Sequence, residues 1–183
     1  MSETVNLTPE ALVEALIFAS PKPVAIDQLA RAAGLPVEEA LTALDRLEAG
    51  LAERGLRLQR HRNAVQLVSA PEAAPFIEAL LGLEVGIRLT QAAIETLAIV
   101  AYAQPVTRPQ IESIRGVNSD STLRTLLSAG LVEEVGRAET LGRPILYCTT
   151  FEFLQQFGLQ RPEDLPPLQQ QAETQSPATH PEA

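Results

Sequence analysis

The chain has 183 residues, of which 45% are hydrophobic, and it carries a net charge of −9. This length and composition predict one large or two small folded domains. The acidic balance disfavours nucleic-acid phosphates as the main partner, because such binding depends on Lys and Arg. The sequence has no apolar run long enough to span a membrane and no signal-peptide pattern from Met1 to Pro9, so we expect a cytoplasmic protein.

Cysteine and histidine are scarce. Cys148 is the only cysteine, and His61 and His180 are the only histidines. These residues cannot form an internal disulfide, and they fall short of the usual zinc ligand set. The sequence also lacks a phosphate-binding glycine loop, a metalloprotease helix motif and a nucleophile–base pattern. We therefore expect no enzyme activity, metal or cofactor, and we expect Cys148 to be a small buried hydrophobic residue.

The first half of the chain predicts three helices. The first begins at the Thr8-Pro9 pair, a cap followed by a proline in the first turn, and ends before Pro21. Ala25 to Ala33 forms the second, and Pro36 opens a third that runs to Glu53. Apolar residues at helical spacing predict the buried faces: Leu12, Leu16 and Ile17; Ile26 and Leu29; and Val37, Leu41, Leu44, Leu47 and Leu51.

Alternating apolar and polar residues then predict a half-buried hairpin with its turn at His61 to Asn63. Leu58 and Val65 belong to the inward face, whereas Gln59 and Gln66 belong to the outward one. We interpret His61 as a solvated turn residue. A short helix follows, with an apolar stripe of Phe76, Ile77, Leu80 and Leu81 that offers surface for dimerisation.

The second half repeats this plan. A shift of 82 positions places Pro23-Val24 on Pro105-Val106 and Gly34 on Gly116. Helix starts are predicted at Thr90, at a Thr107–Gln110 capping box, at Asn118 or Ser119, and at a Thr149–Glu152 capping box; strands are predicted at Leu131 to Val135 and Ile145 to Thr149. The inward positions of these elements are Ile94, Leu97 and Val100; Ile111 and Ile114; Leu123, Leu126 and Leu127; and Phe153, Leu154 and Phe157.

This order of elements predicts a mainly α fold with small β-hairpins (α+β), made of two tandem winged helix-turn-helix domains plus a disordered C-terminal tail. We expect an N-terminal domain over residues 1–83, a linker over 84–89 and a C-terminal domain over 90–165. Residues 166–183 are expected to be a disordered acidic tail, because Pro, Gln, Glu and Ser there leave too little apolar surface to bury.

The third helix of each half lacks the charge of a DNA-reading helix. The first carries Glu38, Glu39, Asp45 and Glu48 against Arg46, and the second carries Arg124 offset by Asp120. These acids fit either a solvated helix face or a protein-binding face. Arg108, Arg115 and Arg124 form a small basic patch, whose members are either surface ion pairs or partner contacts.

Several segments together resemble the segregation and condensation protein B (ScpB) family. They are IETLAIVAYAQPVTRPQIESIRGVNSDSTLRTLLSAGLVEEVGR, GRPILYCTT, EFLQQFGL and DLPPL, within a match from Leu7 to Leu168. The resemblance implies a homodimer paired through its N-terminal domain, with a C-terminal domain that binds the kleisin ScpA. It also implies a non-enzymatic subunit of the bacterial condensin, associated with the nucleoid, that reaches the SMC ATPase through ScpA and contacts nucleic acid indirectly at most.

The same resemblance, combined with the residue pattern, predicts the partner-binding residues. They are Arg115, Val117, Asn118, Ser119, Arg124, Arg143 and Tyr147. Tyr147 is expected to be mainly a core residue. The rival hypothesis is a winged-helix transcriptional regulator that binds DNA, which rests on fold analogy alone. A salt-dependent gel shift with the isolated protein distinguishes the two.

Overall fold

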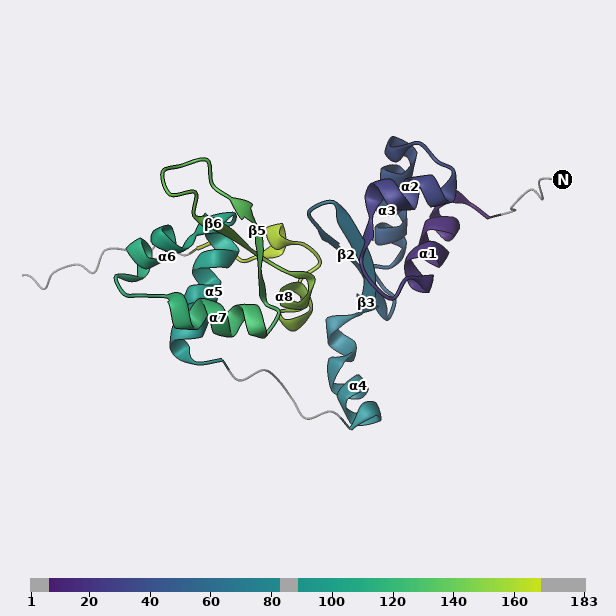
Figure 1. The fold of residues 1–183 in the computed structure, drawn as a ribbon. Coiled ribbons are helices and arrows are strands. Elements are labelled where there is room, and N and C mark those ends of the chain that lie inside the picture. The colour runs from purple at the N-terminus through teal and green to yellow at the C-terminus, as the bar shows by residue number, and fades with distance from the viewer. Residues whose placement is uncertain (1–6, 83–88, 169–183) are drawn as a thin grey trace, which may run out of the picture.

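The computed structural model describes residues 7–82 and 89–168 (Figure 1). Most of the predicted linker and all of the predicted tail after Leu168 lie outside these residues. In the part of the chain that the structure describes, no helix is long and apolar enough to cross a membrane. The described residues form two units, each of which combines helices with a small antiparallel sheet.

The N-terminal unit packs three helices against a three-stranded sheet of order β1-β3-β2. Its elements are α1 (Pro9–Ala19), β1 (Val24–Ala25), α2 (Ile26–Ala33), α3 (Val37–Gly50), β2 (Leu56–His61) and β3 (Ala64–Ser69). A 3-10 turn (Pro71–Ala73) and the short helix α4 (Ala74–Leu81) follow the sheet.

The C-terminal unit has the same order of elements and the equivalent strand order β4-β6-β5. Its elements are α5 (Gln91–Ala103), β4 (Val106–Thr107), α6 (Arg108–Arg115), α7 (Asp120–Ser128), β5 (Val132–Arg137), β6 (Ile145–Thr149) and α8 (Phe151–Gln156), with a final 3-10 turn at Pro162–Asp164.

The strand register confirms the predicted repeat. Val24 pairs with Val65 in the first sheet, and Val106 pairs with Tyr147 in the second, so both partners are displaced by the same 82 positions. The hairpins differ. Arg62 and Asn63 alone connect β2 to β3, whereas residues 138–144 connect β5 to β6, and β5 has a register shift between Glu134 and Gly136.

Capping side chains begin several of the helices, as the sequence predicts. Thr8 Oγ1 accepts a hydrogen bond from the Ala11 N–H, and Thr90 Oγ1 accepts one from the Ala93 N–H. The last helix begins one residue later than predicted, because Thr150, not Thr149, is its cap and accepts from the Phe153 N–H at 3.1 Å. Thr149 is buried instead, with its N–H and its hydroxyl both 2.8 Å from Gln104 Oε1.

Each unit has its own hydrophobic core, and small residues fill more of it than the sequence pattern predicts. Val13 and Ile17 form the buried stripe of α1, while Leu12 and Leu16 are only half-buried. The helices pack closely over buried alanines, among them Ala40, Ala43, Ala93 and Ala101. Four predicted core residues at the margins of the apolar stripes are exposed: Val37, Ile94, Ile114 and Phe157.

The outer face of β2 is covered by the C-terminal unit, beside α8 (Figure 1). Gln59, predicted to face solvent, is 1% exposed, and its Nε2 donates a hydrogen bond to the Leu159 carbonyl at 2.7 Å. His61, interpreted from the sequence as a solvated turn residue, is 5% exposed; its Nε2 lies 2.7 Å from the Thr149 carbonyl, and its ring meets Phe151 edge-on. Both predictions were wrong, because the pattern of one hairpin carries no information about a second unit that packs on it.

Candidate functional site

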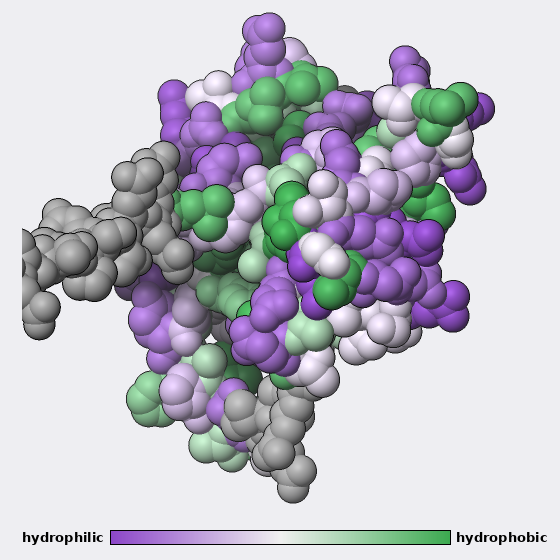
Figure 2. Space-filling view, turned by 90° about the vertical axis from the view of Figure 1, so that its left-hand side faces the viewer, coloured by the Kyte–Doolittle hydropathy of each residue, from purple (hydrophilic) through white to green (hydrophobic). Residues whose placement is uncertain are grey.

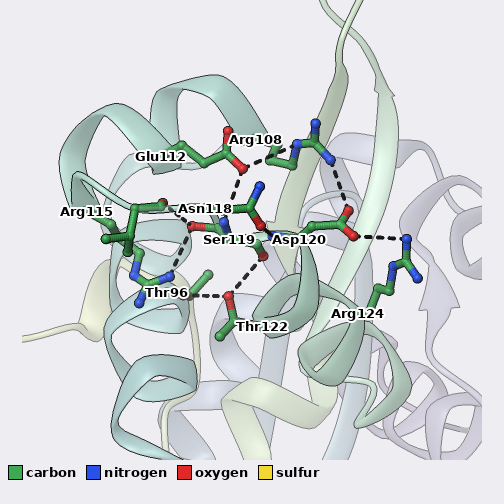
Figure 3. A network of polar contacts seen from close by, with 10 residues as sticks. Thr96, Arg108, Glu112, Arg115, Asn118, Ser119, Asp120, Thr122 and Arg124 are labelled. Atoms are coloured by element: carbon green, nitrogen blue, oxygen red, sulfur yellow. Dashed lines mark hydrogen bonds and ion pairs between the residues drawn. The ribbon is translucent and has the colours of Figure 1, made fainter.

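A polar network surrounds the turn between α6 and α7 (Figure 3). Gly116 ends α6 in the left-handed conformation, with φ at 73°, which glycine adopts at little cost. Ser119 lies at the centre of the network and is fully buried. Its N–H donates to Glu112 Oε1 at 3.1 Å, and its Oγ accepts from Arg115 Nη1 at 3.1 Å. The end of α6 therefore fixes the start of α7.

Three further hydrogen bonds complete the turn. Of the two caps that the sequence left open, Ser119 occupies the N-cap position of α7 without a side-chain capping hydrogen bond, while Asn118 Oδ1 accepts from the Asp120 N–H at 3.0 Å. The Thr122 hydroxyl donates to the Ser119 carbonyl at 2.9 Å and accepts from Thr96 of α5. Val117 projects from this rigid turn as an exposed apolar side chain.

The three arginines of this region are not a free basic patch. Asp120 is shared between Arg108 Nη1 and Arg124 Nη2, each at 2.9 Å, and Arg108 also approaches Glu112 at 3.5 Å. Arg115 Nη2 lies 3.6 Å from Glu95, and its side chain is only 8% exposed. Carboxylates therefore neutralise all three guanidinium groups, which favours the interpretation of these residues as ion pairs.

The remaining two predicted residues lie apart from the turn. Tyr147 is buried on β6, and it lines a small surface cleft together with Arg108 and Pro109. Arg143 lies in the β5–β6 loop at a φ of 42°, and its carbonyl accepts from Arg137 Nη1 at 3.0 Å. Within residues 7–82 and 89–168, no hydrogen bond or ion pair joins the Arg143 side chain to the network. The structure thus gathers the other five of the seven predicted residues around one turn and leaves Tyr147 and Arg143 outside it.

The predicted partner-binding residues do not include the acidic members of the network, although the sequence already set Asp120 against Arg124. Glu112 lies four residues after Arg108, and Asp120 lies four residues before Arg124, so both pairs have the spacing of helical ion pairs. This spacing is the signal in the sequence that could have predicted both ion pairs. Ile114 and Leu141 are exposed apolar residues of the same unit. Apolar side chains (green) lie between hydrophilic ones (purple) on the face that Figure 2 shows.

Burial raises the pKa of the Tyr147 phenol, with a further upward contribution from Glu134 and a downward one from Arg108. The folded chain holds this proton more tightly than the unfolded chain does. The resulting stabilisation is fully present below the unfolded pKa of about 10 and is lost as the pH rises through the higher folded value. We expect the free energy of unfolding in urea to fall more steeply above about pH 10 in the natural chain than in Tyr147→Phe. Parallel curves would contradict this assignment.

Burial also raises the pKa of the Cys148 thiol, which lies opposite Glu133 in the β5–β6 ladder. Cys148 is free and buried, as predicted from the sequence. A thiol in this environment is weakly nucleophilic at neutral pH. Exposure of the Cys148 thiol to solvent would therefore indicate a change in the structure and not a catalytic role.

Comparisons with known proteins identify the family. A family model described as segregation and condensation complex subunit ScpB matches residues 11–168. Segregation and condensation protein B of Moorella thermoacetica is 48% identical over 168 residues, 90% of this chain and 85% of that protein. The same protein of Carboxydothermus hydrogenoformans is 45% identical over 170 residues, 92% of this chain and 91% of its own length.

Two solved structures are also similar. ScpB from Mycobacterium tuberculosis is 37% identical, with 85% of this chain and 99% of that chain covered and a TM-score of 0.39. A dimer of an ScpB N-terminal domain complexed with an ScpA peptide is 28% identical over 43% of this chain and 99% of that chain, also with a TM-score of 0.39. From the family model and the relatives, the chain belongs to the segregation and condensation protein B family.

Proposed function

We propose that the chain is a non-enzymatic subunit of the bacterial SMC–ScpA–ScpB condensin and supports chromosome condensation and segregation at the nucleoid. It acts as a homodimer that binds the kleisin ScpA, and it reaches the SMC ATPase through ScpA. Membership of the ScpB family supports this role. The partner is the one named for the solved N-terminal domain dimer with an ScpA peptide.

Each unit in this proposal is a winged helix, in which the β2–β3 and β5–β6 hairpins are the wings. The shared order of helix, strand, helix, helix, strand and strand supports the assignment. Residues 1–83 form the pairing domain, residues 90–165 form the kleisin-binding domain, and 84–89 link them. The exposed apolar face of α4 supports pairing through the first of these domains.

One observation carries the proposal: the surface of the α6–α7 turn combines neutralised arginines with exposed apolar side chains. A DNA-reading surface needs free cations to contact phosphates, whereas Arg108, Arg115 and Arg124 are each paired with a carboxylate. Ile114 and Val117 are exposed beside them. An amphipathic helix of ScpA matches this mixture, because its apolar face covers the two aliphatic side chains while its polar edge meets the ion pairs.

Val117→Glu tests the site directly. We expect it to weaken ScpA binding at least tenfold, about 1.4 kcal/mol, because a charge would replace an apolar contact at the centre of the surface. Isothermal titration calorimetry with ScpA measures the effect, and circular dichroism checks the fold. Val37→Glu adds the same charge to an exposed valine of the N-terminal unit, and so separates an effect at the α6–α7 turn from one at the domain that binds an ScpA peptide in the solved dimer.

Unchanged ScpA affinity in a folded Val117→Glu protein would place the binding surface elsewhere. Sequence-specific DNA binding by the chain alone near physiological salt would contradict the adaptor role itself, because the binding would then not need ScpA or SMC. The first outcome would reject the proposed binding surface, and the second would reject the proposed function.

A further inference from the structure

The edge of the N-terminal sheet is covered by a segment of the C-terminal unit. β2 is the outer strand in the order β1-β3-β2, so its free edge carries backbone groups without a strand partner. The Arg60 N–H donates to the Gln160 carbonyl at 2.8 Å, and Gln59 Nε2 donates to the Leu159 carbonyl at 2.7 Å. Residues 159–160 therefore occupy the edge as a short partner strand would.

Ion pairs between the units gather at the same place. Glu48 of α3 accepts from Arg161, which follows the covering segment, and the same hydrogen bond raises the pKa of Arg161. Arg62 Nη1 lies 3.2 Å from Glu133 of β5. Salt weakens such partly exposed pairs. The contact between the units thus depends on ionic strength.

The contact lacks the features of a permanent interface. Among the residues that the structure describes, the hydrophobic clusters of the two units are separate, and no buried cluster spans both. One side-chain atom at the junction, His61 Nδ1, is buried without a hydrogen-bond partner, whereas Arg60 Nε lies 3.0 Å from Glu48 Oε2. Buried unpaired polar atoms favour separation of the surfaces that bury them. Relative motion is the default for domains joined through a polar contact of this kind.

We propose that residues 159–161, Glu48 and the outer face of β2 form a releasable latch, through which the C-terminal unit docks on the N-terminal unit and from which it detaches without unfolding. The occupant of the β2 edge is the chain's own segment 159–161. Release frees the edge of β2 and opens the cleft of about 600 Å³ that His61, Arg62 and Cys148 line between the units. The candidate ScpA surface then changes its position relative to the pairing unit.

Hydrogen exchange at the Arg60 amide measures release, because this N–H is bonded only across the junction. Arg161→Gln removes the charge that pairs with Glu48 between the units, and we expect at least tenfold faster exchange at Arg60 with an unchanged melting temperature. Asp45→Asn is the matched control, since Asp45 pairs with Arg60 inside the N-terminal unit. We expect it to change the exchange less than twofold. Labelling of Cys148 by a maleimide is expected to accelerate together with Arg60 exchange.

Three results would overturn the latch. Rapid exchange at Arg60 in the natural chain would show that the units do not dock. Exchange that occurs only with global unfolding, and that neither Arg161→Gln nor Glu48→Gln accelerates, would show a permanent interface. Protection that disappears on dilution would show that the covering segment comes from a second copy. Raising the salt concentration must accelerate Arg60 exchange more in the natural chain than in Arg161→Gln.

Discussion

Replacing Arg115 by glutamate will destabilise the C-terminal unit by about 3–5 kcal/mol, because it buries a charge without a partner. The Arg115 side chain is 8% exposed, holds Ser119 through its Nη1 and faces Glu95. A carboxylate there would stand against Glu95 and Glu112, the second of which binds the Ser119 N–H. Urea denaturation followed by circular dichroism measures the loss.

Arg124→Glu provides the contrast. Its side chain is 78% exposed and pairs with Asp120 on the surface of α7, so its reversal will cost less than about 1 kcal/mol. A free energy of unfolding for Arg115→Glu within 1 kcal/mol of the natural chain would contradict the structural role of Arg115. If that role holds, weaker ScpA binding by Arg115→Glu says nothing about contact, whereas weaker binding by Arg124→Glu does.

Substitution of Phe76 and Leu80 by glutamate is expected to separate the proposed homodimer. The two side chains are 76% and 82% exposed on α4, where no described residue is buried. Large apolar groups at this level of exposure are characteristic of a surface that a partner covers. Because the double substitution removes one aromatic and one aliphatic side chain from this surface, we expect the dimer dissociation constant to rise at least about a hundredfold, or about 2.7 kcal/mol.

Sedimentation velocity over a range of concentrations measures this dissociation. Val37→Glu again serves as the control, because it adds the same charge to an exposed position of the same unit on α3. A double variant that remains as dimeric as this control would exclude α4 from the pairing surface. The exposed Phe18 on α1 would then be the next candidate.

Local signals made much of each unit predictable from the sequence. Thr8 and Thr90 cap helices, and Gly34 and Gly116 end them, because these effects depend on residues within one or two turns. The predicted bounds of β6, Ile145 to Thr149, are also the observed ones. Neighbouring residues of equal capping ability are harder to separate. Thr149 and Thr150 are distinguished by residues distant in the sequence, because Gln104 binds the first and the Gly130 carbonyl accepts from the second.

The candidate site was predicted less completely. The sequence motif brought out Arg115 to Ser119 but not Glu95, which reaches the turn from α5. The sequence predicted a basic patch of Arg108, Arg115 and Arg124, because it does not show which carboxylates face these side chains in space. The predictions that Gln59 and His61 face solvent were wrong for a related reason, because a different unit of the same chain packs over these side chains.

The identical register of Val24 with Val65 and of Val106 with Tyr147 also bears on how this chain arose. An offset of 82 that holds at both strands means that no net insertion or deletion separates these points in one unit relative to the other. Duplication of a single ancestral gene segment accounts for this most simply. The connection of the second hairpin, residues 138–144, is longer than that of the first, and α7 is shorter than α3, with 9 residues against 14, so the two copies have exchanged length between the third helix and the loop tip, where the chain tolerates additions.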